Sequence, residues 1–188
     1  ANALRSILRQ DPDIIMIGEI RDNETAEIAV KASITGHLVV STLHTNNSAS
    51  TITRLEDMGI EPYLIADSVV GVIAQRLVRR LCPKCKKSRM AEAVDLETLG
   101  MPLDSEAVIY EPVGCHMCNN TGYYGRIGVY EIMEITPKLK EVIARHGNAD
   151  EINKVALSEG MKTLRISASK YVLSGVTSIS EMKRIAFE

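Results

Sequence analysis

Apolar residues form two uninterrupted runs near the start of the chain, at 14–18 and 38–40. A short run without a polar residue is typical of a strand that is buried on both faces of a parallel sheet. Over 23–35 and 48–58, apolar residues recur at helical spacing, and a glycine follows each segment, as is common where helices end. The order strand, helix, strand, helix predicts a right-handed βαβ unit.

Three further elements are predicted around this unit. A short helix over 4–9 precedes the first run, and Asp11-Pro12-Asp13 ends it. Pro62 begins another short helix, which extends to about Val69. Valine, isoleucine and leucine are then interleaved with arginine over 70–81, which favours a third strand, with a helix as the alternative.

The chain divides into three segments by composition: 1–81, 82–135 and 136–188. The first predicts an α/β fold. The second holds all four cysteines, five of the twelve glycines and three of the six prolines, with one small helix expected around Leu96–Met101. The third predicts short amphipathic helices that form a small bundle on the sheet, beginning near Pro137, Asp150, Leu164 and Ser178 or Ser180.

Composition narrows the class of protein. The 188 residues are 45% hydrophobic and 24% charged, which excludes a disordered or fibrous chain. The net charge of −2 argues against nucleic-acid binding over the whole surface. No apolar run reaches the roughly 20 residues of a membrane span, and the N-terminus does not have the pattern of a signal peptide, so we expect a reducing cytoplasm. Without an initiator methionine, the chain is expected to be a fragment whose natural start lies upstream.

Two polar residues directly follow the predicted strands. Glu19 comes after the first apolar run and His44 comes shortly after the second. The carboxyl ends of parallel strands meet at one edge of a sheet, where ligands bind in α/β folds. An acid after such a strand is the Walker B pattern, and it orients Mg²⁺ or polarises a water that attacks a γ-phosphate. The alternative is a solvated strand end with His44 in a loop.

A phosphate site also needs a loop that surrounds the phosphates. The P-loop pattern G-x-x-x-x-G-K-[ST] is absent, because no glycine in this sequence is followed by lysine. The sequence therefore predicts half of a nucleotide site, with the acid and without the phosphate loop.

The four cysteines form two C-x-x-C pairs, Cys82 with Cys85 and Cys115 with Cys118. Two such pairs supply the four thiolates of a tetrahedral structural zinc site. The 29 residues between them exceed the commonest ribbon spacing, which an insertion over 89–107 explains. A thioredoxin-like redox pair needs only one C-x-x-C, and disulfides do not suit the expected compartment. His116 is a spare residue expected to point to water.

Seven basic residues and no acidic residue lie between Arg76 and Arg89. A nucleic-acid patch is one interpretation. The preferred interpretation is that these cations stabilise the net charge of −2 of a zinc ion with four thiolates. No stacking aromatic residues interrupt the basic stretch, so no nucleic-acid partner is expected.

Several segments together resemble one protein family. The stretch Leu4-Arg5-Ser6-Ile7-Leu8-Arg9-Gln10-Asp11-Pro12-Asp13, continuing into Ile17-Gly18-Glu19-Ile20-Arg21-Asp22, resembles the Walker B segment of the ATPases that drive type II secretion and type IV pilus assembly. Thr35–Asn46 resembles the His box of that family. The match continues through Arg54–Gly59, Ala74–Arg79 and the cysteine module as far as Arg126.

The resemblance implies a partial RecA-like P-loop NTPase domain over 1–81, a tetracysteine zinc subdomain over 82–135 and a C-terminal helical subdomain over 136–188. It implies that Glu19 is the catalytic carboxylate and that His37 and His44 line the γ-phosphate side. It also implies nucleotide-site roles for Arg21 and Arg54, which help to tie the site to a neighbouring subunit.

For the complete enzyme, the resemblance implies ATP and Mg²⁺, a homo-hexamer, and platform proteins at the cytoplasmic face of the bacterial inner membrane. The fragment alone is expected to be inactive. Pilus extension and type II secretion are not distinguished by these residues. The alternative function is a zinc-ribbon binding or adaptor module without catalysis.

Overall fold

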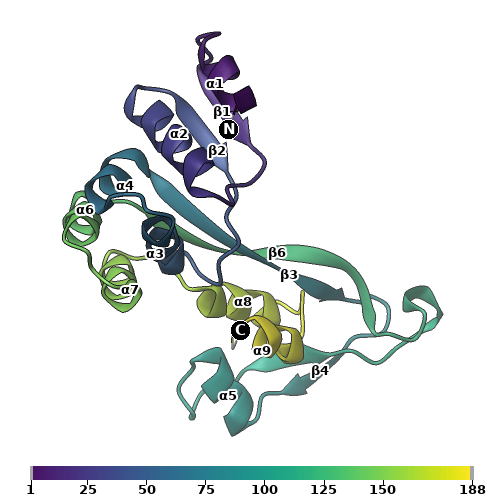
Figure 1. Cartoon of the computed structure of the whole chain (residues 1–188). Helices are drawn as coiled ribbons and strands as arrows, with labels where there is room; N and C mark the ends of the chain where they lie inside the picture. The colour runs from purple at the N-terminus through teal and green to yellow at the C-terminus, as the bar shows by residue number, and fades with distance from the viewer. Residues whose placement is uncertain (1, 187–188) are drawn as a thin grey trace. The chain divides into compact units, whose positions relative to one another are not determined.

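The computed structural model describes the backbone of residues 2–186 (Figure 1). The chain folds into two compact units, and each unit is built from two separate stretches of sequence. The first unit comprises Ala1–Ile73 and Ile132–Met161, and the second comprises Ala74–Glu131 and Lys162–Glu188. The units therefore do not coincide with the three compositional segments, and the assignment of those segments as subdomains stays a prediction.

The first unit contains the predicted βαβ arrangement. Strands β1 (Ile14–Ile17) and β2 (Leu38–Ser41) pair in parallel, and helix α2 (Asn23–Ile34) connects them. The Asp22 carboxylate begins α2 by accepting a hydrogen bond of 2.8 Å from the backbone N–H of Thr25. The α/β prediction for this segment is confirmed.

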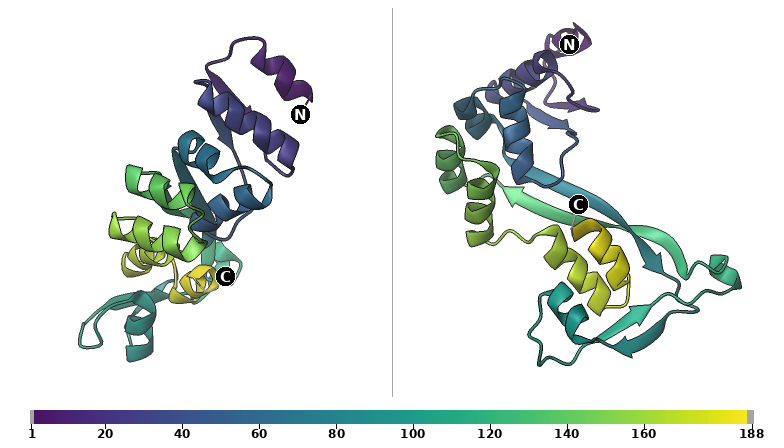
Figure 2. Two further views of the ribbon diagram at one scale, coloured as in Figure 1. Left: turned by 60° about the vertical axis from the view of Figure 1, so that its left-hand side comes forward. Right: turned by 60° about the horizontal axis from the view of Figure 1, so that its bottom comes forward.

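One expectation about this sheet is wrong. The strands were expected to be buried on both faces, but Ile14 is 64% exposed and Met16 is 80% exposed. Ile15 points the other way and packs against Leu4 of α1 (Asn2–Leu8) and Ala32 of α2, on the face that α1 and α2 cover (Figure 2). Within the described residues, helices cover only that face of the two-stranded sheet.

The main core of the first unit lies among helices. It gathers apolar side chains from α3 (Ala49–Asp57), α4 (Pro62–Ser68), α6 (Pro137–Ala144) and α7 (Ala149–Ser158). Its fully buried members include Ile52, Ile65, Leu139, Ile143 and Ile152. The predicted helices are confirmed, although Asn148 rather than Asp150 caps α7, by accepting from the Glu151 N–H.

The second unit is built on strands that the sequence only partly predicted. The strand over 70–81 is confirmed as β3 (Gly71–Leu81), and it pairs with β6 (Tyr123–Glu134), which was not predicted. Residues 74–81 of β3 and 123–131 of β6 belong to the second unit. Strands β4 (Lys87–Met90) and β5 (Val108–Glu111) form an antiparallel pair beside helix α5 (Ala93–Leu99).

Helices α8 (Leu164–Leu173) and α9 (Ile179–Ala186) complete the second unit. Val172 and Met182 from these helices are fully buried with Val78 and Val129 from the strands. The expectation of one helical bundle after residue 136 is therefore wrong, because α6 and α7 pack in the first unit and α8 and α9 pack in the second. No helix in the described part of the chain is both long and apolar enough to cross a membrane.

Candidate sites at a strand edge and at a cysteine cluster

The first candidate site lies where β1 and β2 end. Pairing continues past both strands, because the Ile20 N–H donates to the Thr42 carbonyl at 3.0 Å. The Thr42 hydroxyl also donates to the Gly18 carbonyl at 2.6 Å. These bonds fix the backbone on both sides of Glu19, so its carboxylate projects from the carboxyl edge of the parallel pair, where α/β folds bind ligands.

The structure brings three of the predicted site residues together at this edge. One carboxylate oxygen of Glu19 lies 2.7 Å from Nε of Arg21 and 3.3 Å from Nε2 of His44. The hydrogen bond and charge of Arg21 lower the pKa of Glu19 below its usual value. The carboxylate is therefore ionised at neutral pH, as an acid that orients a metal ion or a water must be. His44 is 83% exposed and open to a ligand.

Two other predicted residues do not reach Glu19. The Nδ1 atom of His37 lies 3.0 Å from the Ala32 carbonyl and 3.2 Å from the Thr35 hydroxyl. His37 precedes β2 and His44 follows it, so the strand holds the two imidazoles at opposite ends. Arg54 is exposed on α3. The nucleotide-site roles of His37 and Arg54 stay predictions.

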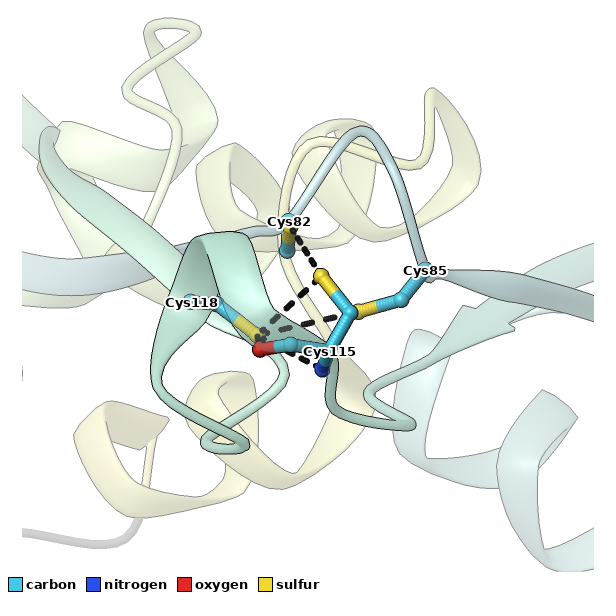
Figure 3. A group of neighbouring side chains, drawn as sticks. All are labelled: Cys82, Cys85, Cys115 and Cys118. Atoms are coloured by element: carbon cyan, nitrogen blue, oxygen red, sulfur yellow. Dashed lines mark hydrogen bonds between the residues drawn. The ribbon is translucent and has the colours of Figure 1, made fainter.

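The second candidate site is the cysteine cluster, which lies wholly in the second unit. The four Sγ atoms of Cys82, Cys85, Cys115 and Cys118 all lie within 4.8 Å of one another (Figure 3). The Cys82 N–H donates to the Gly122 carbonyl at 2.9 Å, which ties the first pair to the chain that follows the second. The four cysteines could hold a metal ion.

The sulfur spacing distinguishes a metal site from disulfides. Three of the Sγ–Sγ distances are 3.8 Å: Cys82–Cys115, Cys85–Cys118 and Cys115–Cys118. A disulfide needs about 2.05 Å, and all four cysteines are free. A tetrahedron with Zn–S bonds of about 2.3 Å has edges of about 3.8 Å. The spacing fits a tetrahedral Cys₄ zinc site.

Backbone N–H groups point at two of the sulfurs. Cys118 is partly desolvated, but the N–H groups of Cys115 and Gly122, each 3.2 Å from its sulfur, lower its pKa to about 6. Desolvation raises the pKa of Cys85 to about 11, although the Gly114 N–H donates to its sulfur at 3.3 Å. These donors stabilise thiolates, which are the form that binds metal.

Some of the basic residues that were expected to stabilise the charge of the thiolates form ion pairs with carboxylates instead. Arg79 pairs with Glu181 at 2.8 Å, and Arg89 pairs with Asp95 and Glu111, each at 2.5 Å. For these two arginines the expectation is wrong, because carboxylates of the same unit neutralise them. The N–H donors described above were not predicted. The signal was the glycine four residues after Cys118: Gly122 has a φ of +75°, and a Cβ there would collide with Pro112.

The strand edge and the cysteine cluster define an α/β protein with an acidic edge on a parallel sheet and a separate four-cysteine centre. Residues 1–184 match the model of the family described as type II/IV secretion system protein. The chain belongs to this family.

Relatives and solved structures agree with this assignment. The chain is 54% identical to the type IV pilus assembly ATPase PilB of Acinetobacter baylyi, covering 100% of this chain and 33% of the relative. It is 46% identical to the type II secretion system protein E of Pseudomonas aeruginosa, covering 100% of this chain and 37% of the relative. The chain thus spans about a third of the length of these relatives.

Among solved structures, the pilus retraction motor PilT with bound ADP superposes with a TM-score of 0.67 at 25% identity, covering 98% of this chain and 43% of PilT. The ATPase DotB of Yersinia pseudotuberculosis superposes with a TM-score of 0.69 at 20% identity, covering 98% of this chain and 39% of DotB, which supports the fold alone.

Proposed function

We propose that this chain is part of an ATP-hydrolysing motor that powers type IV pilus assembly or type II protein secretion. The observation that carries the proposal is the position of Glu19, an ionised carboxylate at the carboxyl edge of a parallel strand pair, in a chain whose relatives are named as pilus assembly ATPases and a type II secretion protein. In the complete protein the motor is a homo-hexamer that acts on platform proteins at the cytoplasmic face of the inner membrane.

In this proposal Glu19 is the general base. With Mg-ATP bound, the carboxylate accepts a hydrogen bond from the attacking water and aligns it with the γ-phosphorus. Arg21 lowers the pKa of Glu19, so the carboxylate stays ionised to lower pH than it would without this partner. In this proposal His44, which lies 3.3 Å from the same carboxylate oxygen, contacts a γ-phosphate oxygen. The phosphate loop comes from another part of the protein, because this sequence contains no such loop.

The cysteine cluster has a structural role in this proposal. Zinc supplies a tetrahedral crosslink between the two C-x-x-C pairs. The four thiolates join the end of β3 to the turn before β6, which are 33 residues apart in sequence at Cys82 and Cys115.

The test is Glu19→Gln in the full-length protein. The substitution preserves shape and removes the charge that aligns the water, so the hydrolysis rate should fall by about 10²–10⁴-fold while ATP binding persists. Glu27→Gln is the matched control, because Glu27 is also exposed and ion-paired, with Lys31 at 2.6 Å, but lies on α2. A Glu19→Gln protein that hydrolyses ATP at the rate of the control would overturn the assignment.

A further inference from the structure

The basic stretch between Arg76 and Arg89 is only partly neutralised by carboxylates of the described residues. Arg79 and Arg89 have acidic partners. In the described part of the chain, no acidic side chain forms an ion pair with Arg80 or Lys86. Lys86 instead donates to the Gly175 carbonyl at 2.7 Å and lies over the ring of Tyr110. An ammonium has three N–H groups, so Lys86 keeps donors for a further acceptor.

These two cations line the same pocket. The cavity has a volume of about 190 Å³ and lies in the second unit. Its lining comes from the end of β3, the first cysteine pair, β6 and the end of α8, and consists of Arg80, Leu81, Pro83, Lys86, Tyr124, Ser174, Gly175 and Val176. None of these residues is acidic, so the lining carries two positive charges.

The walls of the pocket are fixed before any ligand binds. The Leu81 N–H donates to the Val176 carbonyl at 2.8 Å, which joins β3 to the segment after α8. The bond from Lys86 to Gly175 joins the same segment to the chain after the first cysteine pair. Gly175 has a φ of +67°, and a Cβ there would come 2.6 Å from the Tyr110 ring. A site that is held in this way loses little conformational freedom when it binds.

We propose that this pocket binds a carboxylate, the side chain of an aspartate or glutamate in a segment of a partner protein. Arg80 offers a planar fork that matches a carboxylate, and Lys86 adds a second charge. Tyr124, which is 57% exposed, and Pro83 surround the charged pair with ring surface. Tyrosine and arginine are residue types that are enriched in protein interfaces.

The size and polarity of the pocket favour a carboxylate over a phosphate compound. Pockets for drug-sized ligands, the size range of a nucleotide, measure roughly 300–1,000 Å³, which exceeds this volume. Part of the pocket lining, Ser174–Val176, directly follows the C-terminal end of α8. The negative end of the helix dipole disfavours a phosphate dianion more than a carboxylate with one charge. This inference does not depend on the proposed ATPase activity.

The test measures fluorescence anisotropy of two labelled nine-residue peptides with the zinc-loaded, full-length protein. One peptide carries three glutamates among glycine and serine, and the other carries glutamine at those positions. We expect saturable binding of the acidic peptide only, which weakens at higher salt as an exposed ion pair does. Arg80→Gln should weaken it by about 10-fold, the effect of one charge-assisted contact. Lys87→Gln, which removes one exposed charge outside the pocket, should leave it unchanged.

Arg80 is the residue to vary because, among the described residues, it has no acidic partner whose loss would disturb the fold. Equal zinc content and equal melting temperature of Arg80→Gln and the parent protein confirm that both are folded. Three results would overturn the proposal: no saturable binding of the acidic peptide, equal binding of both peptides, or equal affinity of Arg80→Gln and Lys87→Gln. Displacement of the peptide by millimolar inorganic phosphate at constant ionic strength would assign the pocket to phosphate and overturn it as well.

Discussion

The strand edge around Glu19 and the cysteine cluster are built in different ways. At the strand edge, side chains contact one another, and Arg21 and His44 are 74% and 83% exposed. At the cluster, Cys82 and Cys118 are buried, and backbone N–H groups point at the sulfurs. The cluster has a full set of four ligands within one compact unit, whereas the edge offers an acid without a phosphate loop. The cluster thus has its four candidate ligands within one unit of this chain, whereas under the proposed function a phosphate loop from another part of the protein would join the strand edge.

This comparison predicts where each site is sensitive. The backbone N–H groups that point at the sulfurs belong to the folded unit. Because metal binding is coupled to folding, loss of one cysteine ligand should disrupt the local structure around the cluster. Exposed side chains contribute little to stability, so changes at the strand edge should alter chemistry and leave folding unchanged.

The largest expected effect is that of Cys118→Ser. Elemental analysis should give about one zinc per chain for the parent protein and close to none for the variant, because a tetrahedral Cys₄ site loses one of its four ligands. The Cys82–Gly122 bond and the bonds of Leu81 and Lys86 to 175–176 adjoin the first cysteine pair. Hydrogen exchange at the amides of Leu81 and Cys82, which donate in two of these bonds, should therefore rise first.

His116→Ser is the matched control for this substitution. His116 lies between the second pair of cysteines but is exposed, so its loss should leave zinc content unchanged. A folded, reduced parent protein that contains no metal would contradict the zinc assignment.

The second effect is that of Glu181→Gln. The side chain of Glu181 is only 2% exposed. It accepts from the Arg79 backbone N–H at 2.7 Å and from the Arg79 side chain at 2.8 and 3.0 Å. Because Arg79 is half exposed, we expect a loss of about 1–3 kcal/mol in the free energy of unfolding, the range for hydrogen bonds to a charged group. Glu151→Gln, at an exposed pair with Arg145, should cost less than about 0.5 kcal/mol.

The same carboxylate makes this effect depend on pH. Burial acts to raise the pKa of Glu181, but the hydrogen bonds from Arg79 and Arg184 hold it below the usual value. A lowered pKa in the folded state adds stability that is complete above the unfolded pKa of about 4.3 and is lost as pH falls through the folded value. Urea unfolding at neutral pH and at about pH 3 should show the difference between parent and Glu181→Gln shrinking in acid. A constant difference would contradict the assignment.

These two sites also show what the sequence can predict. The positions of Glu19 and His44 at one edge follow from two local apolar runs and from the rule that parallel strands end together. The cysteine pairs are visible as a repeated spacing. Glu181 was not identified, because its partner Arg79 lies 102 residues away and nothing near either residue indicates the pair.

Strand β6 was missed for a related reason. Its inward face includes Val129 and Met133 but also the buried carboxylate Glu131, while Tyr130 and Ile132 on the outward face are apolar and exposed. The alternation of apolar and polar residues that marks a half-buried strand is therefore absent. Packing of Val129 and Met133 in the buried cores sets this strand, and the sequence pattern does not.

The third prediction concerns nucleotide binding by the 188-residue chain alone. Affinity for a triphosphate comes mainly from the N–H groups and the lysine of a phosphate loop, which this sequence lacks. Calorimetric titration with Mg-ATP should therefore show millimolar affinity at best and no hydrolysis. Micromolar binding would mean that the chain holds a complete phosphate site, and the contrast between the two sites would fail.

The smallest effect is that of Arg21→Gln on the titration of Glu19. Arg21 provides the first and largest contribution that lowers the pKa of Glu19, so the substitution should raise that pKa toward its ordinary value. The carboxylate remains ionised at neutral pH in both proteins. Carbon-13 NMR of the Glu19 carboxyl group reports the change directly, and the free energy of unfolding should stay close to that of the parent protein because the pair is exposed.

Lys31→Gln separates a local effect from a change in overall charge. Lys31 pairs with Glu27 on α2, so its loss should raise the pKa of Glu27 and leave Glu19 unchanged. In the full-length protein, Arg21→Gln should also move the acidic limb of the hydrolysis rate to higher pH, in step with the carboxyl titration. If the NMR titration moves and the acidic limb does not, then Glu19 is not the base whose ionisation limits hydrolysis, although Arg21 still lowers its pKa.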